Sequence, residues 1–134
     1  MSGSNLETIK AIYHAFGTGE LPELLDLLDE DLIWNMSENH PYADGNPYCG
    51  PEAVLTGVFA RSMSEWSGFA VEIDDAVDAG DTIVAWGRYT GIYTRTSKEQ
   101  NAQFAHVWKL RDGKVIRYQE YSDTLHLARV METD

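Results

Sequence analysis

The segment NAQFAHVWKLRDGKVIRYQEY, from Asn101 to Tyr121, carries the strongest pattern for a fold in this chain. It contains two runs rich in β-branched, aromatic and other apolar residues, which predict strands over residues 101–110 and 115–121. Between them stands Arg111-Asp112-Gly113-Lys114, and Asp-Gly suits the central positions of a primed hairpin turn. The stretch therefore predicts an antiparallel hairpin near the end of the chain.

Further strands are predicted upstream of this hairpin. From Phe69 onward apolar residues alternate with small or acidic ones, which indicates a strand with one buried face. A turn at Ala79-Gly80-Asp81 precedes a long strand over residues 82–94, and residues 32–36 form a short strand earlier in the chain. The second half of the chain therefore predicts an antiparallel meander.

Helices are predicted before the meander and after it. Ser4 followed by Glu7 has the spacing of a capping box, so a first helix begins there. Pro22 and Pro51 each occupy a first-turn position, where the missing N–H costs nothing, and open a second and a third helix. A short helix follows from Thr124. Helices first and a meander last are typical of an α+β domain, in which a curved sheet wraps the helices around a pocket.

Composition excludes several classes of protein. The 134 residues suit one domain, and 22 acidic against 10 basic residues give a net charge of −12, which disfavours nucleic-acid binding. No apolar stretch is long enough to span a membrane, and Met1 to Asn5 lacks the features of a secretory signal. Cys49 is the only cysteine, so no disulfide within the chain is possible. We expect a soluble cytoplasmic protein with one domain over residues 1–134.

The charge is unevenly distributed. Residues 1–87 carry 16 acidic and 2 basic side chains, whereas residues 88–134 carry 6 and 8. We interpret the acidity as a property of the surface that favours solubility. If Arg88 faces the pocket, a neutral or a mildly anionic ligand fits.

One loop is long for a compact domain. Residues 37–50 lie between a predicted strand and the third helix, and loops of this length are often functional. His40 within it is a candidate proton shuttle at the mouth of the pocket. The alternative is a solvated histidine beside Pro41.

The order of elements and four short segments resemble the nuclear transport factor 2-like superfamily, in particular its SnoaL-like and ketosteroid-isomerase-related members. The segments are Ala15-Phe-Gly-Thr-Gly-Glu-Leu21, Gly50-Pro-Glu-Ala-Val54, Ala105-His-Val-Trp-Lys-Leu-Arg-Asp-Gly-Lys-Val115 and Glu120-Tyr-Ser-Asp-Thr124. The resemblance implies a cone-shaped barrel whose cavity holds a small apolar molecule, and a homodimer formed on the opposite face of the sheet.

The chemistries that the resemblance implies are only partly represented. Ile12, Met36 and Ala105 stand at the three catalytic positions of a ketosteroid isomerase, so that mechanism is not expected. The resemblance also includes small epoxide hydrolases, which use two Asp, an Arg, a Tyr and an Asn. Asn35 and Arg88 match this set and Glu120 stands at one of the Asp positions, whereas Thr90 replaces the other Asp and Ile33 replaces the Tyr. SnoaL-like cyclases use an acidic residue near the end of the last strand, where Asp123 stands.

Alternation along the strands assigns side chains to faces. If Arg88 points into the cavity, Trp86 and Thr90 do so too. On the neighbouring strands the cavity side is then expected to hold Gln103, Ala105 and Val107, and Tyr118, Glu120 and Ser122. His106 and Trp108 are expected to point outward, toward the dimer interface.

These observations predict an enzyme that transfers a proton on an apolar carbonyl compound without a cofactor or metal. The catalytic candidates are Glu120, Arg88 and Asp123, and the substrate-binding candidates are Trp34, Asn35, His40, Trp86 and Tyr118. Two alternatives stay open: a non-catalytic protein that binds a hydrophobic molecule, and a hydrolase that uses Asn35, Arg88 and Glu120. A purely structural ion pair between Glu120 and Arg88 is also an alternative.

Overall fold

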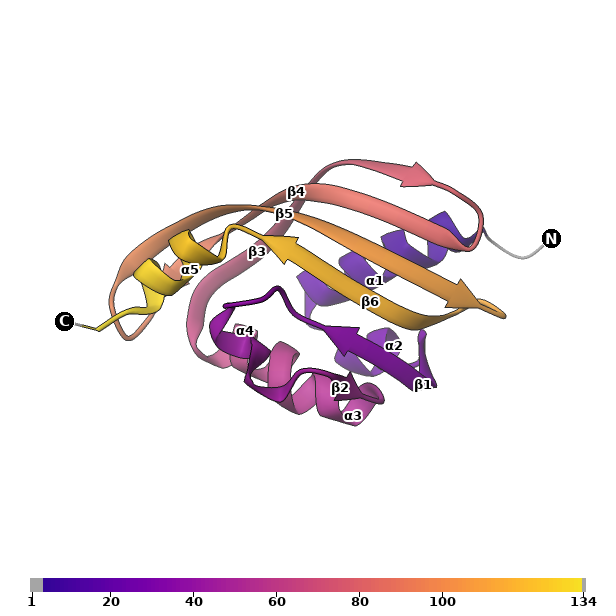
Figure 1. Cartoon of the computed structure of the whole chain (residues 1–134), viewed down its shortest axis with the longest axis horizontal. Coiled ribbons are helices and arrows are strands. Elements are labelled where there is room, and N and C mark those ends of the chain that lie inside the picture. Colours follow the sequence, from indigo (N-terminus) through magenta and orange to yellow (C-terminus); the bar gives the residue numbers. More distant parts are fainter. Residues whose placement is uncertain (1–3, 134) are drawn as a thin grey trace.

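The computed structural model describes residues 4–133 (Figure 1). Met1 to Gly3, the first residues of the segment that lacks the features of a secretory signal, lie outside the described residues. The helices are α1 (Asn5–Thr18), α2 (Leu21–Leu25), η1 (Pro41–Gly45), α3 (Pro51–Val54), η2 (Leu55–Phe59), α4 (Ala60–Ser64) and α5 (Thr124–Met131). The strands are β1 (Leu28–Asn35), β2 (Tyr48–Cys49), β3 (Trp66–Asp78), β4 (Thr82–Tyr93), β5 (Lys98–Arg111) and β6 (Lys114–Ser122).

The strands form one curved sheet in the order β2-β1-β6-β5-β4-β3. In Figure 1 the strands β4, β5 and β6 arch over the helices, with α5 at the far end of the sheet from the β5–β6 turn. The predicted α+β class and the meander of long strands are confirmed. The prediction of a wholly antiparallel sheet is wrong at one pair, because β1 runs parallel to β6. The sheet does not close, since β2 and β3 are its two edges.

The first helix begins where the capping pattern predicts. The Ser4 hydroxyl accepts a hydrogen bond from the Glu7 N–H at 3.2 Å, and Gly19 ends the helix in the left-handed region with φ 75°. The second helix is shorter than its leucines suggest. It ends at Leu25, and Leu28 already belongs to β1, where it pairs with Val115 of β6. Tertiary pairing thus overrides the helical spacing of these leucines.

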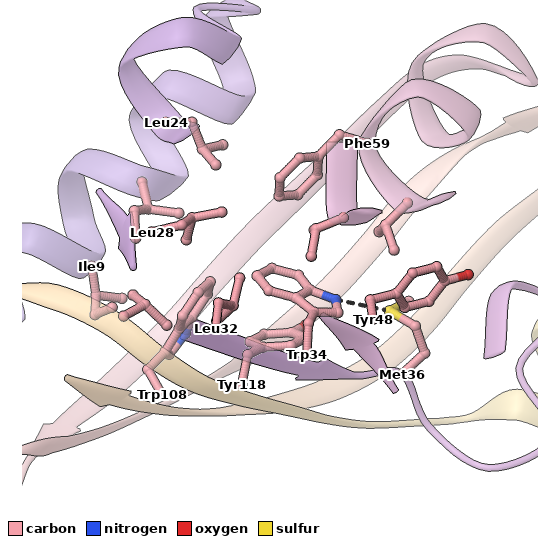
Figure 2. Packing of buried hydrophobic residues seen from close by; sticks show 14 of the residues in the cluster. Ile9, Leu24, Leu28, Leu32, Trp34, Met36, Tyr48, Phe59, Trp108 and Tyr118 are labelled. Carbon is pink, nitrogen blue, oxygen red and sulfur yellow. Dashed lines mark hydrogen bonds between the residues drawn. The ribbon is translucent and has the colours of Figure 1, made fainter. Parts of the chain in front are cut away.

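Aromatic side chains connect β1 to the last two strands of the core (Figure 2). The Trp34 ring stacks on Tyr118 with 3.7 Å between ring centroids, and Trp108 packs edge-on against Trp34. The indole N–H of Trp34 points to the sulfur of Met36 at 3.3 Å. This cluster holds the parallel pair β1–β6 against the helices.

A bulge in the β5–β6 hairpin sets which side chains face the helices. Arg111 pairs with Lys114 across the predicted turn and Leu110 with Val115, but Lys109 pairs with Arg117. Ile116 is therefore an extra residue on β6, and every pair beyond it is displaced by one position. His106 consequently lies opposite Glu120, whereas a regular hairpin would put Ala105 there.

This displacement overturns the predicted faces of β4 and β5. Directly paired residues share a face of the sheet, so His106 and Trp108 point toward the helices together with Glu120 and Tyr118. On β4 the inward residue is Tyr89, while Trp86 and Arg88 are exposed on the outer face. The predicted outward orientation of His106 and Trp108 and the predicted inward orientation of Arg88, Trp86, Gln103 and Ala105 are therefore wrong.

Over the part of the chain that the structure describes, no helix is long and apolar enough to cross a membrane.

The close approach of the β3 backbone to β4 depends on Gly87. A Cβ atom at this position would lie 1.8 Å from the backbone oxygen of Glu72 on β3, where β3 has a register shift. We expect Gly87→Ala to destabilise the fold by at least about 2–3 kcal/mol, because backbone and not a flexible side chain has to move. Urea denaturation followed by circular dichroism measures this.

Gly17→Ala is the matched control. Gly17 lies in α1, and a Cβ there meets nothing within 4 Å. Alanine should stabilise the helix by about 0.5–1 kcal/mol. Equal midpoints for Gly87→Ala and the unchanged chain would contradict the role given to Gly87.

Candidate active site

A largely apolar cavity lies between the concave face of the sheet and the helices. About 60 Å³ within it is open to the centres of water-sized molecules, so the space between its walls is larger than this volume. Side chains from helices α1, α2 and α5, the segment 51–64, β1 and the loop after it, and strands β3 to β6 line it, and most of them are aliphatic or aromatic. The polar residues among them include His40, Gln100, His106 and Glu120. No lysine or arginine belongs to the lining that the described residues form.

Glu120 is the charged group of this cavity. Its side chain is 1% exposed, and both carboxylate oxygens accept hydrogen bonds. The oxygen Oε1 accepts from the Ser37 backbone N–H at 3.2 Å, from the Ser37 hydroxyl at 2.9 Å and from the Ser122 hydroxyl at 3.3 Å. The oxygen Oε2 accepts from the Tyr89 hydroxyl at 2.5 Å. A buried carboxylate is tolerated when donors replace its hydration in this way.

A chain of hydrogen bonds leads from helix α1 to Glu120, and its protons can be assigned. The Trp108 indole N–H can only donate, and it donates to the Tyr13 hydroxyl at 2.9 Å. Tyr89 gives its proton to the Glu120 carboxylate, so its oxygen accepts from His106 Nε2–H, and Nδ1 of the neutral ring accepts the Tyr13 proton at 2.7 Å. With Nδ1 as acceptor, neutral His106 carries its proton on Nε2 and donates it to the Tyr89 hydroxyl at 2.5 Å. Every donor in the chain thus points toward the carboxylate.

The pKa values agree with this assignment. Burial lowers the pKa of the His106 imidazole to about 3 despite the nearby Glu120 charge, so the ring is neutral. Burial alone would raise the pKa of Glu120. The hydrogen bonds from Tyr89 and Ser37 oppose that effect, as does the positive charge of His40 or His106 whenever either ring is protonated, and the pKa of Glu120 lies below its ordinary value of 4.5. The cavity therefore contains an ionised carboxylate beside a neutral imidazole.

His40 lines the same cavity. Its Nδ1 accepts the backbone N–H of Tyr42 at 2.8 Å, which leaves the proton of the neutral ring on Nε2. Burial lowers the pKa of His40 more than the charge of Glu120 raises it, so the neutral ring is favoured. The solvated histidine considered as the alternative does not fit, because His40 is only 9% exposed and lines the cavity.

The loop that carries His40 is fixed in position. Arg61 of α4 forms a two-pronged ion pair with Asp44, at 2.7 and 3.0 Å, and its guanidinium lies 4.3 Å from the centre of the Tyr42 ring. The Tyr42 hydroxyl donates to Glu65 and accepts the indole N–H of Trp66, the latter at 3.0 Å. These contacts hold the loop in place, so its residues His40 and Tyr42 form a fixed part of the cavity wall.

The predicted site residues fall into two groups. Glu120, Tyr118, Trp34 and His40 line the cavity. The others lie outside it. Arg88 is exposed and donates to the Asn101 carbonyl at 3.0 Å, and Trp86 is 38% exposed on the same outer face.

Asn35 and Asp123 also lie outside the cavity. Asn35 lines a separate polar hollow together with Gln119. Asp123 caps α5 by accepting the His126 N–H at 3.2 Å. The alternative of an ion pair between Glu120 and Arg88 is wrong, because the β-bulge turns Arg88 to the other face.

The sequence patterns do not identify five members of the network. They predict the wrong face for His106 and Trp108 and no role for Tyr13, Ser37 or Tyr89. One signal was present: a glutamate within an apolar strand requires donors, and a tyrosine and a histidine stand on the two preceding strands. Their faces depend on the single extra residue in β6.

The described residues contain no group of three or more His, Cys, Asp or Glu side chains placed to hold a metal ion.

Comparison with known proteins agrees with the fold. A structure of an NTF2-like protein from Burkholderia thailandensis is 28% identical, with a TM-score of 0.91 over 98% of this chain and 99% of that one. A candidate SnoaL-like polyketide cyclase from Jannaschia is 16% identical, with a TM-score of 0.82 over 97% and 93%. IdmH, a candidate polyketide cyclase from Streptomyces antibioticus, is 18% identical, with a TM-score of 0.79 over 96% and 99%. No curated protein matches the sequence.

The family model for the SnoaL-like domain matches residues 9–118, which include strands β1 to β5 and most of the residues that line the cavity. The chain therefore belongs to the SnoaL-like family.

Proposed function

We propose that this chain is an enzyme that moves a proton on an apolar carbonyl compound, without a cofactor, in an isomerisation, aldol cyclisation or dehydration. Glu120 is the base. The observation that supports this is the Glu120 carboxyl group, 1% exposed and surrounded by hydrogen-bond donors, in the wall of a largely apolar cavity. Burial of a carboxyl group costs free energy unless hydrogen-bond donors compensate it. Buried ionisable groups in the wall of a cavity are typical of catalytic sites.

The reaction conserves the charge of the cavity. When Glu120 accepts a proton from the carbon next to a carbonyl, its negative charge passes to the enolate oxygen of the substrate. No charge is created in the low-dielectric site, so the step needs only a hydrogen-bond donor at the enolate oxygen to stabilise its product. The Nε2–H of His40 is the donor suited to the carbonyl oxygen, because its Nδ1 is occupied by the Tyr42 N–H.

The network around Glu120 positions the base. Tyr89 and Ser37 fix the carboxylate between two sets of donors, and His106 fixes Tyr89. The similar structures described as candidate polyketide cyclases support the same class of chemistry, since ring closure by an aldol step begins with removal of such a proton. The hydrolase alternative receives no support, because Asn35 and Arg88 lie outside the cavity.

Proton exchange on a simple ketone tests the proposal. In D₂O, wild-type protein should accelerate the replacement of the α-hydrogens of 2-tetralone by deuterium, followed by NMR or mass spectrometry. Glu120→Gln should slow the catalysed exchange by at least about 100-fold, because a general base contributes that much or more. The near-isosteric amide keeps the shape of the side chain.

Glu52→Gln is the control, since Glu52 is exposed on α3. Unchanged exchange in a folded Glu120→Gln variant would refute Glu120 as the base. If wild-type protein binds the ketone in the cavity and does not accelerate its exchange, the non-catalytic binding protein is favoured.

The pH dependence of exchange follows from the direction of the pKa shift. The base is active when ionised, so the rate should fall with acid only below the ordinary carboxyl value of 4.5. Tyr89→Phe removes a donor that stabilises the ionised form, so the pKa of Glu120 rises and the acid limb moves to higher pH. A rate–pH profile together with NMR titration of the labelled glutamate carboxyl measures both.

The exposed Tyr121 of β6 provides the control substitution, Tyr121→Phe, which should leave the acid limb in place. A wild-type limb centred near the ordinary histidine pKa of about 6.5 would point to an imidazole as the base instead.

A further inference from the structure

Gln100 on β5 is a buried polar residue that the network around Glu120 does not use. Its side chain is 1% exposed and lines the cavity. Its Nε2 donates to the backbone carbonyl of Thr90 on β4 at 3.4 Å. Its Oε1 is fully buried and has no hydrogen-bond partner among the described residues.

The orientation of the amide is fixed by its neighbour. The Thr90 carbonyl can only accept, so the nitrogen of Gln100 has to face it, and a flipped amide would place two oxygens together. The oxygen is therefore the atom without a partner. An unsatisfied buried acceptor costs about 1–3 kcal/mol, and a leucine of similar size would avoid that cost. A ligand that donates to Oε1 explains why a glutamine stands here.

Gln100 and Glu120 lie toward opposite ends of the cavity wall. Glu120 is opposite His106 in the β5–β6 pairing, and Gln100 precedes His106 by six residues on β5. Six residues of strand span about 20 Å along the backbone, so the two side chains enter the cavity wall at separate positions. Between the two positions the inward residues of β5 are Ala102 and Phe104, both buried.

We propose that Gln100 is a specificity-determining residue, whose Oε1 accepts a hydrogen bond from a hydroxyl group on an elongated, apolar, neutral ligand. The hydroxyl lies at the end of the ligand remote from the carbonyl that faces Glu120 and His40. The orientation of the ligand rests on the proposed function, whereas the hydrogen bond to Gln100 can be measured by binding alone. The apolar wall between the two polar positions selects a rigid hydrocarbon body.

Two ketones that differ in one hydroxyl test this proposal. The probes are 4-(4-hydroxyphenyl)cyclohexanone and 4-phenylcyclohexanone, and calorimetry or tryptophan fluorescence gives their dissociation constants. Wild-type protein should prefer the hydroxylated probe by about 5- to 50-fold, because the deoxy probe leaves Oε1 buried and unpaired. Gln100→Leu should abolish the preference, mainly by weakening the hydroxylated probe.

Gln103→Leu is the matched control, because Gln103 lies on the same strand and is exposed on the outer face. It should keep the wild-type preference. Gln100→Met is the second variant, for use if the branched side chain disturbs folding. Urea denaturation checks that both Gln100 variants fold, since each substitution removes the unsatisfied acceptor together with the donor to the Thr90 carbonyl.

The outcomes separate this proposal from that of the base. If wild-type protein shows no preference, including no binding of either probe, or if both Gln100 variants retain it, the proposal is overturned. A crystal structure of the complex with only a water molecule on Oε1 would overturn it too. If Glu120→Gln leaves both exchange and the preference unchanged, Glu120 is not the base while the role of Gln100 stands.

Discussion

The buried negative charge of Glu120 is the constraint on which the rest of this structure depends. Removing a carboxylate from water costs several kcal/mol even after relaxation, so its position is tenable only with donors in place. Ser37 supplies two of them from the end of β1, Tyr89 supplies one from β4, and Ser122 supplies one from β6. Hydrogen bonds to this one carboxylate thereby connect β4, β6 and the loop after β1.

The orientation of these donors depends in turn on a second layer. Tyr89 can give its proton to Glu120 because the His106 N–H occupies its oxygen, and His106 is fixed by Tyr13 and ultimately by Trp108. Helix α1 thus reaches the carboxylate through an aromatic chain whose members also pack as core. Packing and electrostatics are carried by the same side chains, so a substitution within the chain should affect both.

Much of the fold follows from local patterns in the sequence. The Asp112-Gly113 turn, the Ser4 cap and the helix opening at Pro51 are determined by neighbouring residues, and each lies where its pattern predicts. The faces of β6 follow as well, because Tyr118 and Glu120 are two residues apart and both point inward.

The faces of β4 and β5 do not follow from such patterns. Period-two alternation gives each strand two equivalent assignments, and only the pairing register chooses between them. The register changes at Ile116, where one extra residue moves His106 opposite Glu120. Nothing local in the sequence distinguishes this bulge from a regular strand, and the resemblance to epoxide hydrolases favoured the other face for Arg88. Without the extra residue Ile116, the predicted cavity contains Arg88 together with Glu120. With it, the cavity that the described residues form contains the Glu120 carboxylate and no arginine.

That difference decides the charge of the ligand. With Arg88 on the outer face, no lysine or arginine of the described chain lines the cavity to balance a second negative charge. Two like charges 4 Å apart repel by about 4 kcal/mol at the effective dielectric constant of a protein, roughly a thousandfold in binding. A mildly anionic ligand, compatible with an inward Arg88, is thus disfavoured beside Glu120. The net charge of −12 lies on the surface and does not select the ligand; the single buried charge of Glu120 does, and it favours a neutral molecule.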